Sequence, residues 1–188
     1  MNIFVLDLDP KKCAEYHCDK HICKMIVEHN QILGSIAYTA RDVMRKKDIT
    51  PEFIKKHFQG FPRKDSEGGP RPYGIGYKNH PCTKWAADSF DNYIWLCTLN
   101  LEMCYEYTRR YKRKHVGEAI TIWYLTNAPE IIKKGMTPFA QAMPEDCKNT
   151  DVVIAYRNYY IKYKVSFAKW AHSAVPEWFV LEKEYETI

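Results

Sequence analysis

Long apolar runs are missing from this chain, because no segment approaches the roughly 20 apolar residues that a membrane-spanning helix needs. The start, MNIFVLDLDP, also lacks the basic residues of a secretory signal and carries two aspartates. We therefore expect a chain without a signal peptide or membrane span, which acts in the cytoplasm.

Paired metal-binding motifs are missing as well. The seven cysteines form no C-x-x-C pair and no zinc-ribbon spacing, and an odd number without a secretory signal predicts reduced thiols. Internal repeats, low-complexity segments and linkers are absent too. The 188 residues are thus predicted to form one domain over 1–188, which is large enough to bury a core without disulfides.

The periodicity that is present is helical, and it predicts an all-α, single-domain helical bundle with an extended N-terminal arm or short strand. Thr50 before Pro51 is a typical helix start. The segment EAITIWYLTNAP is compatible with a helix or a strand. The predicted elements are an arm over 1–9, helices over about 11–45, 51–59, 81–113 and 150–171, and a Gly/Pro-rich loop over 62–80.

Basic and aromatic residues alternate in two runs, RRYKRKH (109–115) and YRNYYIKYK (156–164). Cations neutralise phosphates and aromatic rings stack on bases, so the second run predicts that Arg157, Tyr160 and Lys164 bind a nucleic acid or a nucleotide. The alternatives are a solvated helix end for the first run and core packing for the second. The net charge of +5 favours an anionic partner only modestly.

The segment EYHCDKHICKMIVEHNQ (15–31) concentrates the reactive side chains. On one helix, Cys13, His17 and His21 would lie at i, i+4 and i+8 and form one stripe. Such a stripe is compatible with a zinc site, or with small core cysteines and hydrogen-bonded histidines. One helix face presents only two such groups to a single ion, and further ligands would have to come from elsewhere, for example His80 or Cys82. Because no fourth ligand is obvious, we predict no bound metal and no cofactor.

Asp19 lies beside Lys20 and Lys24 in the same segment. Nearby cations keep a carboxylate ionised, so Asp19 is a candidate for stabilising a developing positive charge or moving a proton. The alternative is an ordinary surface salt-bridge face.

Several motifs resemble those of small, helical, phage-encoded proteins: CDKH (18–21), NHPC..WA (79–86), TPFAQAMP (137–144), AYRNYY (155–160) and PEW (176–178). This resemblance runs over most of the chain and implies action in the host cytoplasm. More distantly, the chain resembles the pyrimidine-dimer DNA glycosylase family. That resemblance rests on the N-terminal arm, an acid on the first helix, a YKNHP turn into a long helix, and a basic, aromatic C-terminal region.

The glycosylase resemblance implies a mechanism. In that family the α-amino group at the start of the chain is the nucleophile, and a glutamate on the first helix is catalytic. By position the glutamate matches Asp19, while Cys18 replaces a neighbouring arginine. Because Asn2 is bulky for removal of the initiator methionine, the free amine is assigned to Met1. An α-amine has a pKa of about 8, so part of it is neutral and nucleophilic.

The resemblance also assigns supporting roles. Lys20, His21 and Lys24 would shape the field at Asp19, and His17 would shuttle a proton. Asn79, His80 and Lys84 would close the pocket from the long helix. The predicted function is cleavage of the N-glycosidic bond of DNA or of a nucleotide. The alternative is a factor that binds or modifies a nucleotide without cleaving DNA, and a structural zinc protein is a third reading. The oligomeric state stays open.

Overall fold

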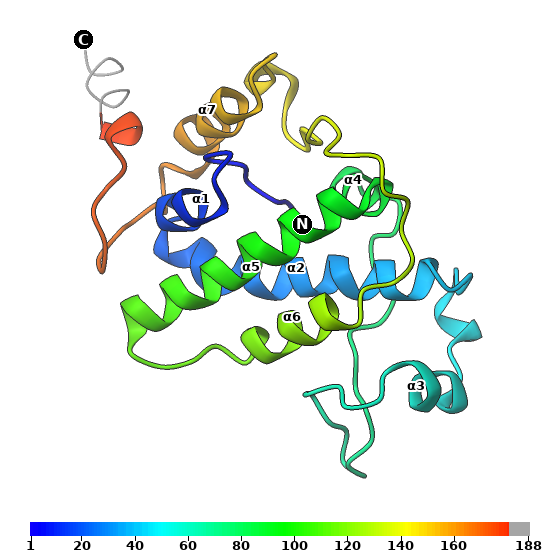
Figure 1. Cartoon of the computed structure of the whole chain (residues 1–188). Coiled ribbons are helices and arrows are strands. Elements are labelled where there is room, and N and C mark those ends of the chain that lie inside the picture. The colour runs from blue at the N-terminus through cyan, green and yellow to red at the C-terminus, as the bar shows by residue number, and fades with distance from the viewer. Residues whose placement is uncertain (181–188) are drawn as a thin grey trace.

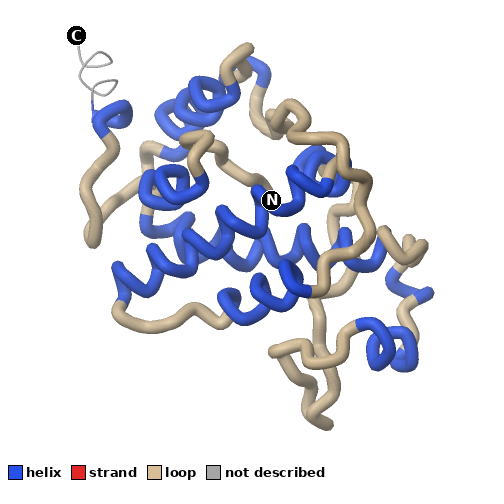
Figure 2. Tube along the Cα trace, in the orientation of Figure 1, coloured by secondary structure: helices blue, strands red, loops and turns tan. Residues whose placement is uncertain are grey.

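Two long helices, α2 (Asp19–Thr39) and α5 (Phe90–Tyr111), lie side by side at the centre of the fold. This computed structural model describes residues 1–180, and within them Figure 2 shows helices and loops but no strand. The expectation of an all-α, single-domain bundle is confirmed. The remaining α-helices are α1 (Pro10–Tyr16), α3 (Pro51–His57), α4 (Pro81–Asp88), α6 (Gly117–Thr126) and α7 (Val152–Lys164), with 3-10 turns at Lys46–Asp48 and Glu145–Cys147.

The N-terminal arm is extended and runs through the interior instead of forming a strand. Ile3, Val5 and Leu6 are fully buried. Without a neighbouring strand, the buried backbone groups of the arm need side-chain partners. The thiol of Cys13 supplies two of them, because Sγ accepts from Leu6 N and donates to Phe4 O, both over 3.3 Å.

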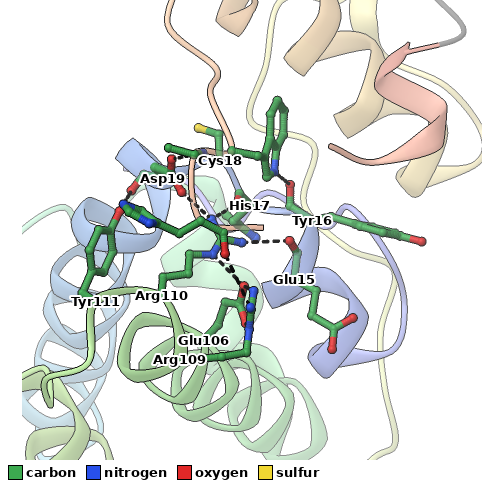
Figure 3. A network of polar contacts seen from close by, with 12 residues as sticks. Glu15, Tyr16, His17, Cys18, Asp19, Glu106, Arg109, Arg110 and Tyr111 are labelled. Carbon is green, nitrogen blue, oxygen red and sulfur yellow. Dashed lines mark hydrogen bonds and ion pairs between the residues drawn. The ribbon is translucent and has the colours of Figure 1, made fainter. Parts of the chain in front are cut away.

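The helix predicted over about 11–45 is interrupted, because His17 and Cys18 are extended between α1 and α2. The cause is Arg110 of α5, which donates to the carbonyl oxygens of Glu15 and His17, each over 2.9 Å (Figure 3). These carbonyls therefore find partners outside a continuous helix. The stripe predicted from uninterrupted helical spacing is consequently not a stripe on one helix.

The helix predicted over 81–113 is also two helices, joined at Ser89. This residue is extended, and its hydroxyl accepts from Asp91 N and donates to Gly135 O. The hydrogen bond to the carbonyl of Gly135, a loop residue distant in the sequence, thus helps to fix the corner between α4 and α5. In contrast, Thr50 caps α3 by accepting from Phe53 N over 3.1 Å, as predicted.

The predicted loop 62–80 lies against α2. Ser35 Oγ accepts from Gly76 N over 3.0 Å and donates to Gly76 O. A Cβ at Gly34 would come within 3.1 Å of Tyr73 O, so the glycine permits this close approach. The ambiguous segment after residue 117 is helix α6, and the last predicted helix ends at Lys164. No helix within residues 1–180 combines the length and apolar character needed to cross a membrane.

Candidate active site

A pocket of about 250 Å³ opens where the N-terminal arm crosses α2 and α7. It collects side chains from residues that lie far apart in the sequence. Its polar and charged lining residues come from three elements: Met1 and Asn2 from the arm, Lys20, His21, Lys24 and Glu28 from α2, and Tyr159 and Lys164 from α7. Phe4, Met25, Ala142 and Phe167 complete the lining.

The α-amino nitrogen of Met1 lies 3.5 Å from Glu28 Oε2. Glu28 also pairs with Lys24, whose Nζ lies 3.2 Å from Oε1 one helical turn away. The Glu28 side chain is only 14% exposed, so solvent screens these pairs less than it would on an open surface. The start of the chain thus presents a primary amine and a carboxylate to the same pocket.

Asn2 fixes the path of the chain next to that amine. Its Nδ2 donates to Ala142 O over 2.7 Å, and its Oδ1 accepts from Ile3 N over 2.8 Å. Asn2 is buried, so these bonds are shielded from competition with water. Residue 1 is therefore held in one position rather than left as a free chain end.

Aromatic rings form one wall of the pocket. The ring of Phe4 stacks on His21 with centroids 4.4 Å apart, and on Tyr159 with centroids 5.7 Å apart. Phe4 has a φ of +39°, a conformation that non-glycine residues rarely adopt. The packed rings hold this strained backbone in place at the pocket wall.

Three lysines give the pocket a positive character. Lys20 Nζ lies 4.5 Å above the ring of Phe167, and Lys164 Nζ lies 4.2 Å from the ring centroid of Tyr159. Lys24 is the third lysine, and the α-amine of Met1 adds a fourth cation. Glu28 is the acidic residue of the lining. An anionic ligand such as a phosphodiester would be attracted here.

His21 is held as a neutral imidazole. Its Nδ1 lies 2.5 Å from the hydroxyl oxygen of Tyr160. Burial lowers the pKa of His21 to about 3, and the charges of Lys164, Lys24 and Lys20 act in the same direction. The ring therefore stays uncharged at neutral pH although it adjoins a charged pocket.

Comparison with known proteins identifies the family of the chain. A model of the pyrimidine dimer DNA glycosylase family matches residues 1–118, which is more than half of the sequence. The chain belongs to the pyrimidine dimer DNA glycosylase family. The resemblance seen in the sequence is thereby confirmed, and the match covers the arm and helices α1 to α5. No curated protein and no solved structure gave a significant match.

Asp19, the residue that the sequence assigns to the family's catalytic acid, does not line this pocket. Its Oδ1 accepts from Arg110 Nη1 over 2.9 Å, and its Oδ2 accepts from Ala171 N over 2.7 Å (Figure 3). The Arg110 side chain is fully buried and also pairs with Glu106. Asp19 thus joins α2 to α5 and to the segment after α7.

The other residues predicted on the first helix divide between pocket and core. Lys20, His21 and Lys24 line the pocket with Met1, whereas His17 is fully buried outside its lining. His17 Nδ1 bonds to Cys13 O over 2.7 Å, and burial holds the pKa of His17 well below its usual value. A neutral, sealed ring of this kind is poorly placed to shuttle protons.

On the YKNHP turn, His80 has a structural role. It caps α4, because its Nδ1 accepts from Cys82 N over 3.2 Å. Burial lowers the pKa of His80, and the positive α-amine lowers it further, which places the ring within electrostatic reach of Met1. Asn79 and Lys84 are exposed and do not line the pocket.

The predicted nucleic-acid residues of α7 are only partly brought to the site. Lys164 lines the pocket. Tyr160 is fully buried, so the prediction that its ring stacks on a base is wrong, because both faces are packed inside the protein. Arg157 is engaged internally, with Nε donating to Leu6 O and its guanidinium lying 5.2 Å from the ring of Trp178.

Of the residues considered as metal ligands, Cys13 and His17 belong to the core, whereas His21 lines the pocket. Cys13, His17 and Cys18 are fully buried, and burial raises the pKa of Cys13 to about 12. No group of three or more His, Cys, Asp or Glu side chains lies in a metal-binding arrangement within residues 1–180.

Glu28, Phe4 and Tyr159 are pocket residues that sequence reasoning missed. Helical spacing offered a signal for one of them. Glu28 lies four residues after Lys24 and seven after His21, so the three side chains share a face of α2. Helical spacing does not show that the N-terminal arm crosses this face of α2.

Proposed function

We propose that this protein is a DNA glycosylase in which the α-amine of Met1 attacks the damaged nucleotide. The observation that carries the proposal is the Met1 nitrogen lying 3.5 Å from Glu28 inside a lysine-lined pocket. A nucleophilic amine beside a carboxylate is the pair that imine-forming cleavage requires. Membership of the pyrimidine dimer DNA glycosylase family supports the same chemistry.

In the first step the neutral amine of Met1 attacks C1′ of the deoxyribose. The bond between C1′ and the base breaks, and the base leaves with the electron pair and takes up a proton. The positive charge that develops on the sugar lies near the Glu28 carboxylate, which stabilises it electrostatically. Ring opening, with transfer of a proton from the amine to O4′, then leaves an imine between Met1 and C1′.

In the second step Glu28 serves as a general base. It accepts a proton from C2′ of the imine, and the electron pair eliminates the 3′ phosphate, which breaks the strand. Water then hydrolyses the imine and frees the amine. Lys20, Lys24 and Lys164 would bind the flanking phosphates and orient the sugar.

The substrate proposed is a pyrimidine dimer in DNA, in keeping with the family. The pocket of about 250 Å³ lies just below the roughly 300–1,000 Å³ typical of drug-sized ligands, so it suits one nucleoside rather than two. The same size also favours the second candidate function, binding or modification of a free nucleotide. The motifs shared with phage proteins support a phage origin and action in the host cytoplasm.

Borohydride trapping tests the proposal. The protein is incubated with duplex DNA that contains one thymine dimer, with undamaged duplex, and with free nucleotides, each in the presence of borohydride. We expect a covalent adduct with the damaged duplex, and peptide mapping should place it on Met1. Strand cleavage without any adduct would point to a water nucleophile, and reaction with free nucleotides alone would favour the second function.

A further inference from the structure

Tyr77, in the turn before α4, is the most exposed Phe, Tyr or Trp residue within residues 1–180. It is 68% exposed, and its side chain forms no hydrogen bond, ring pair or cation-π contact in that part of the chain. A single exposed aromatic residue is common on protein surfaces and requires no explanation by itself. This ring is distinguished by its backbone conformation and by its place beside the N-terminal arm.

The backbone of Tyr77 lies in the left-handed region, with a φ of +57°. Non-glycine residues rarely adopt this conformation, and the surrounding structure has to hold them in it. The preceding residue is held, because Gly76 N donates to Ser35 Oγ of α2 over 3.0 Å. The following residue is held too, since Lys78 Nζ donates to Met44 O over 2.8 Å. The ring is thus presented to solvent by a turn that is fixed on both sides.

The turn adjoins the candidate active site. Helix α4 begins directly after it and contacts the start of the arm, where Thr83 Oγ1 lies 3.9 Å from Met1 Sδ. On α2, Ser35 bonds to the turn and lies seven residues after Glu28, the acid beside the α-amine. Seven residues are about two helical turns, so Ser35 lies about 10 Å further along the same face of α2. The turn that carries Tyr77 therefore continues the face of α2 that lines the pocket.

The surroundings of Tyr77 favour DNA over a protein as the partner. Residues 74–87 contain two lysines, Lys78 and Lys84, and no acidic residue. Cations attract phosphates and aromatic rings stack on bases, so DNA suits both features of the turn. A protein-binding surface would need a core of several exposed apolar side chains. The neighbours of Tyr77 supply none, because Gly76 has no side chain and Ile75 is buried.

A stacking ring needs a base whose face is uncovered. Enzymes that act at the glycosidic bond open the regular stack of the duplex, and proteins that distort DNA commonly insert a side chain where the stack is interrupted. Because the turn around Tyr77 is already fixed, its ring loses little conformational freedom on binding. Its position beside the pocket thus suits contact with DNA that is opened at the sugar attacked by Met1.

We propose that Tyr77 is a DNA-binding residue, whose ring stacks on an uncovered base next to the sugar that Met1 attacks and so stabilises the opened duplex. The proposal rests on the function proposed above, because attack at C1′ requires the stack to open. The lysines hold phosphates, which are present along the whole backbone, whereas Tyr77 responds to an interrupted stack. The preference for damaged over undamaged duplex should therefore depend on this ring.

The first test measures binding in the Glu28→Gln background, so that the strand stays intact. Tyr77→Asn removes the ring, and asparagine tolerates a positive φ better than most residues. We expect this variant to bind the dimer-containing duplex roughly tenfold to a hundredfold more weakly, because one stacked base is lost. The slope of log K against log salt concentration should not change, since no cation is removed. Tyr77→Phe keeps the ring and should bind like the parent protein.

Tyr105→Ala is the matched control, because Tyr105 is a 50% exposed tyrosine of α5 that does not line the pocket of Met1. Thermal unfolding checks the fold of each variant. Tyr77→Gly also removes the ring, relieves the positive φ and should show the same loss as Tyr77→Asn. Parent-like affinity in both ring-less variants, or an equal loss in Tyr105→Ala, would overturn the proposal.

The second test detects stacking directly with 2-aminopurine, a base whose fluorescence is quenched when it is stacked. It is placed in turn opposite the dimer and on either side of it, and each duplex is saturated with protein. We expect at least one position to emit more strongly with Tyr77→Asn than with Tyr77→Phe. Equal emission at every position would reject the stacking role, since saturation removes any effect of affinity.

Borohydride trapping, measured with Glu28 intact, separates this inference from the proposed function. With saturating duplex, Tyr77→Asn should still form the adduct on Met1, because the amine and its carboxylate are unchanged. A Met1 adduct together with undiminished binding in Tyr77→Asn would retain the proposed function and reject this inference. Weaker binding in Tyr77→Asn without any adduct in the wild type would reject the nucleophile and retain the contact with DNA.

Discussion

The buried guanidinium of Arg110 donates to the carboxylate of Asp19 over 2.9 Å, and this bond engages the acid that the sequence would place at the centre of catalysis. The other carboxylate oxygen is occupied by Ala171 N. Glu28, in contrast, faces the α-amine across the pocket. Asp19 and Glu28, the two acids of α2, thus have different surroundings. Substitution of Asp19 should change mainly the stability, whereas substitution of Glu28 should change mainly the activity.

Glu28→Gln should abolish most of the cleavage while leaving stability nearly unchanged. The amide keeps the shape of the side chain but cannot stabilise a cationic sugar or accept the C2′ proton. Loss of one such group costs roughly a hundredfold to a thousandfold in rate, or about 3–4 kcal/mol. Single-turnover cleavage of dimer-containing DNA measures it, and wild-type rates in this variant would remove Glu28 from the mechanism.

Asp19→Asn should act mainly on stability. One carboxylate oxygen is replaced by an amide NH2 group that faces Arg110 or Ala171 N, and the buried guanidinium of Arg110 keeps only Glu106 as an acidic partner. We expect a loss of about 1–3 kcal/mol in the free energy of unfolding, measured with urea. Cleavage by the folded fraction should stay close to that of the wild type. If turnover vanished in a stable Asp19→Asn protein, the catalytic role assigned from the sequence would be restored.

Adding one glycine before Met1 should eliminate the borohydride adduct. The former α-amine becomes a secondary amide, which is not nucleophilic, and the new amine is displaced from Glu28. Binding of dimer-containing DNA should be retained in part, because the lysines remain. An adduct that forms at an undiminished rate in the extended chain would show that a lysine, not the α-amine, is the nucleophile.

Lys20→Ala should reduce the salt dependence of DNA binding. Each neutralised phosphate contributes about 0.7–0.9 to the slope of log K against log salt concentration, so the slope should fall by about that amount. Lys47 is exposed on the turn Lys46–Asp48 and does not line the pocket, so Lys47→Ala is the matched control. Equal slopes for Lys20→Ala and the wild type would contradict phosphate binding at this lysine.

Stability should fall as the pH is lowered below about 6.5, the ordinary pKa of histidine. Burial lowers the pKa of His21 to about 3 and of His29 to about 4, and it holds that of His17 well below its usual value. These rings stay neutral in the folded state, whereas the unfolded chain binds protons below pH 6.5. The stabilisation is therefore complete above that pH and decreases toward the folded-state values.

Each of the three rings contributes up to about 1.4 kcal/mol per pH unit in this window. Together they should remove roughly 3–4 kcal/mol between pH 6 and pH 5. Urea unfolding at both pH values measures the change, and His29→Asn should make the dependence shallower by about one third. A pH-independent free energy of unfolding over this range would contradict the burial of neutral histidines.

The sequence by itself determined the helical class and the local helix starts. Thr50 caps α3 before Pro51, and α4 begins at Pro81, where the predicted helix starts, because helix starts depend on residues within one turn of each other. The N-terminal arm, the acid on the first helix, the YKNHP turn and the basic, aromatic C-terminal region also indicated the family, which the match over residues 1–118 then established.

The tertiary structure decided where the helices break and which acid meets the amine. The interruption at His17 and Cys18 depends on Arg110, more than ninety residues away, because the backbone carbonyls there bond to its guanidinium. Glu28 rather than Asp19 faces Met1 because the start of the buried arm lies against the third turn of α2, where Asn2 fixes it on Ala142. Helical spacing shows which side chains share a face of one helix. Only long-range packing determines which of those side chains a distant segment of the chain will contact.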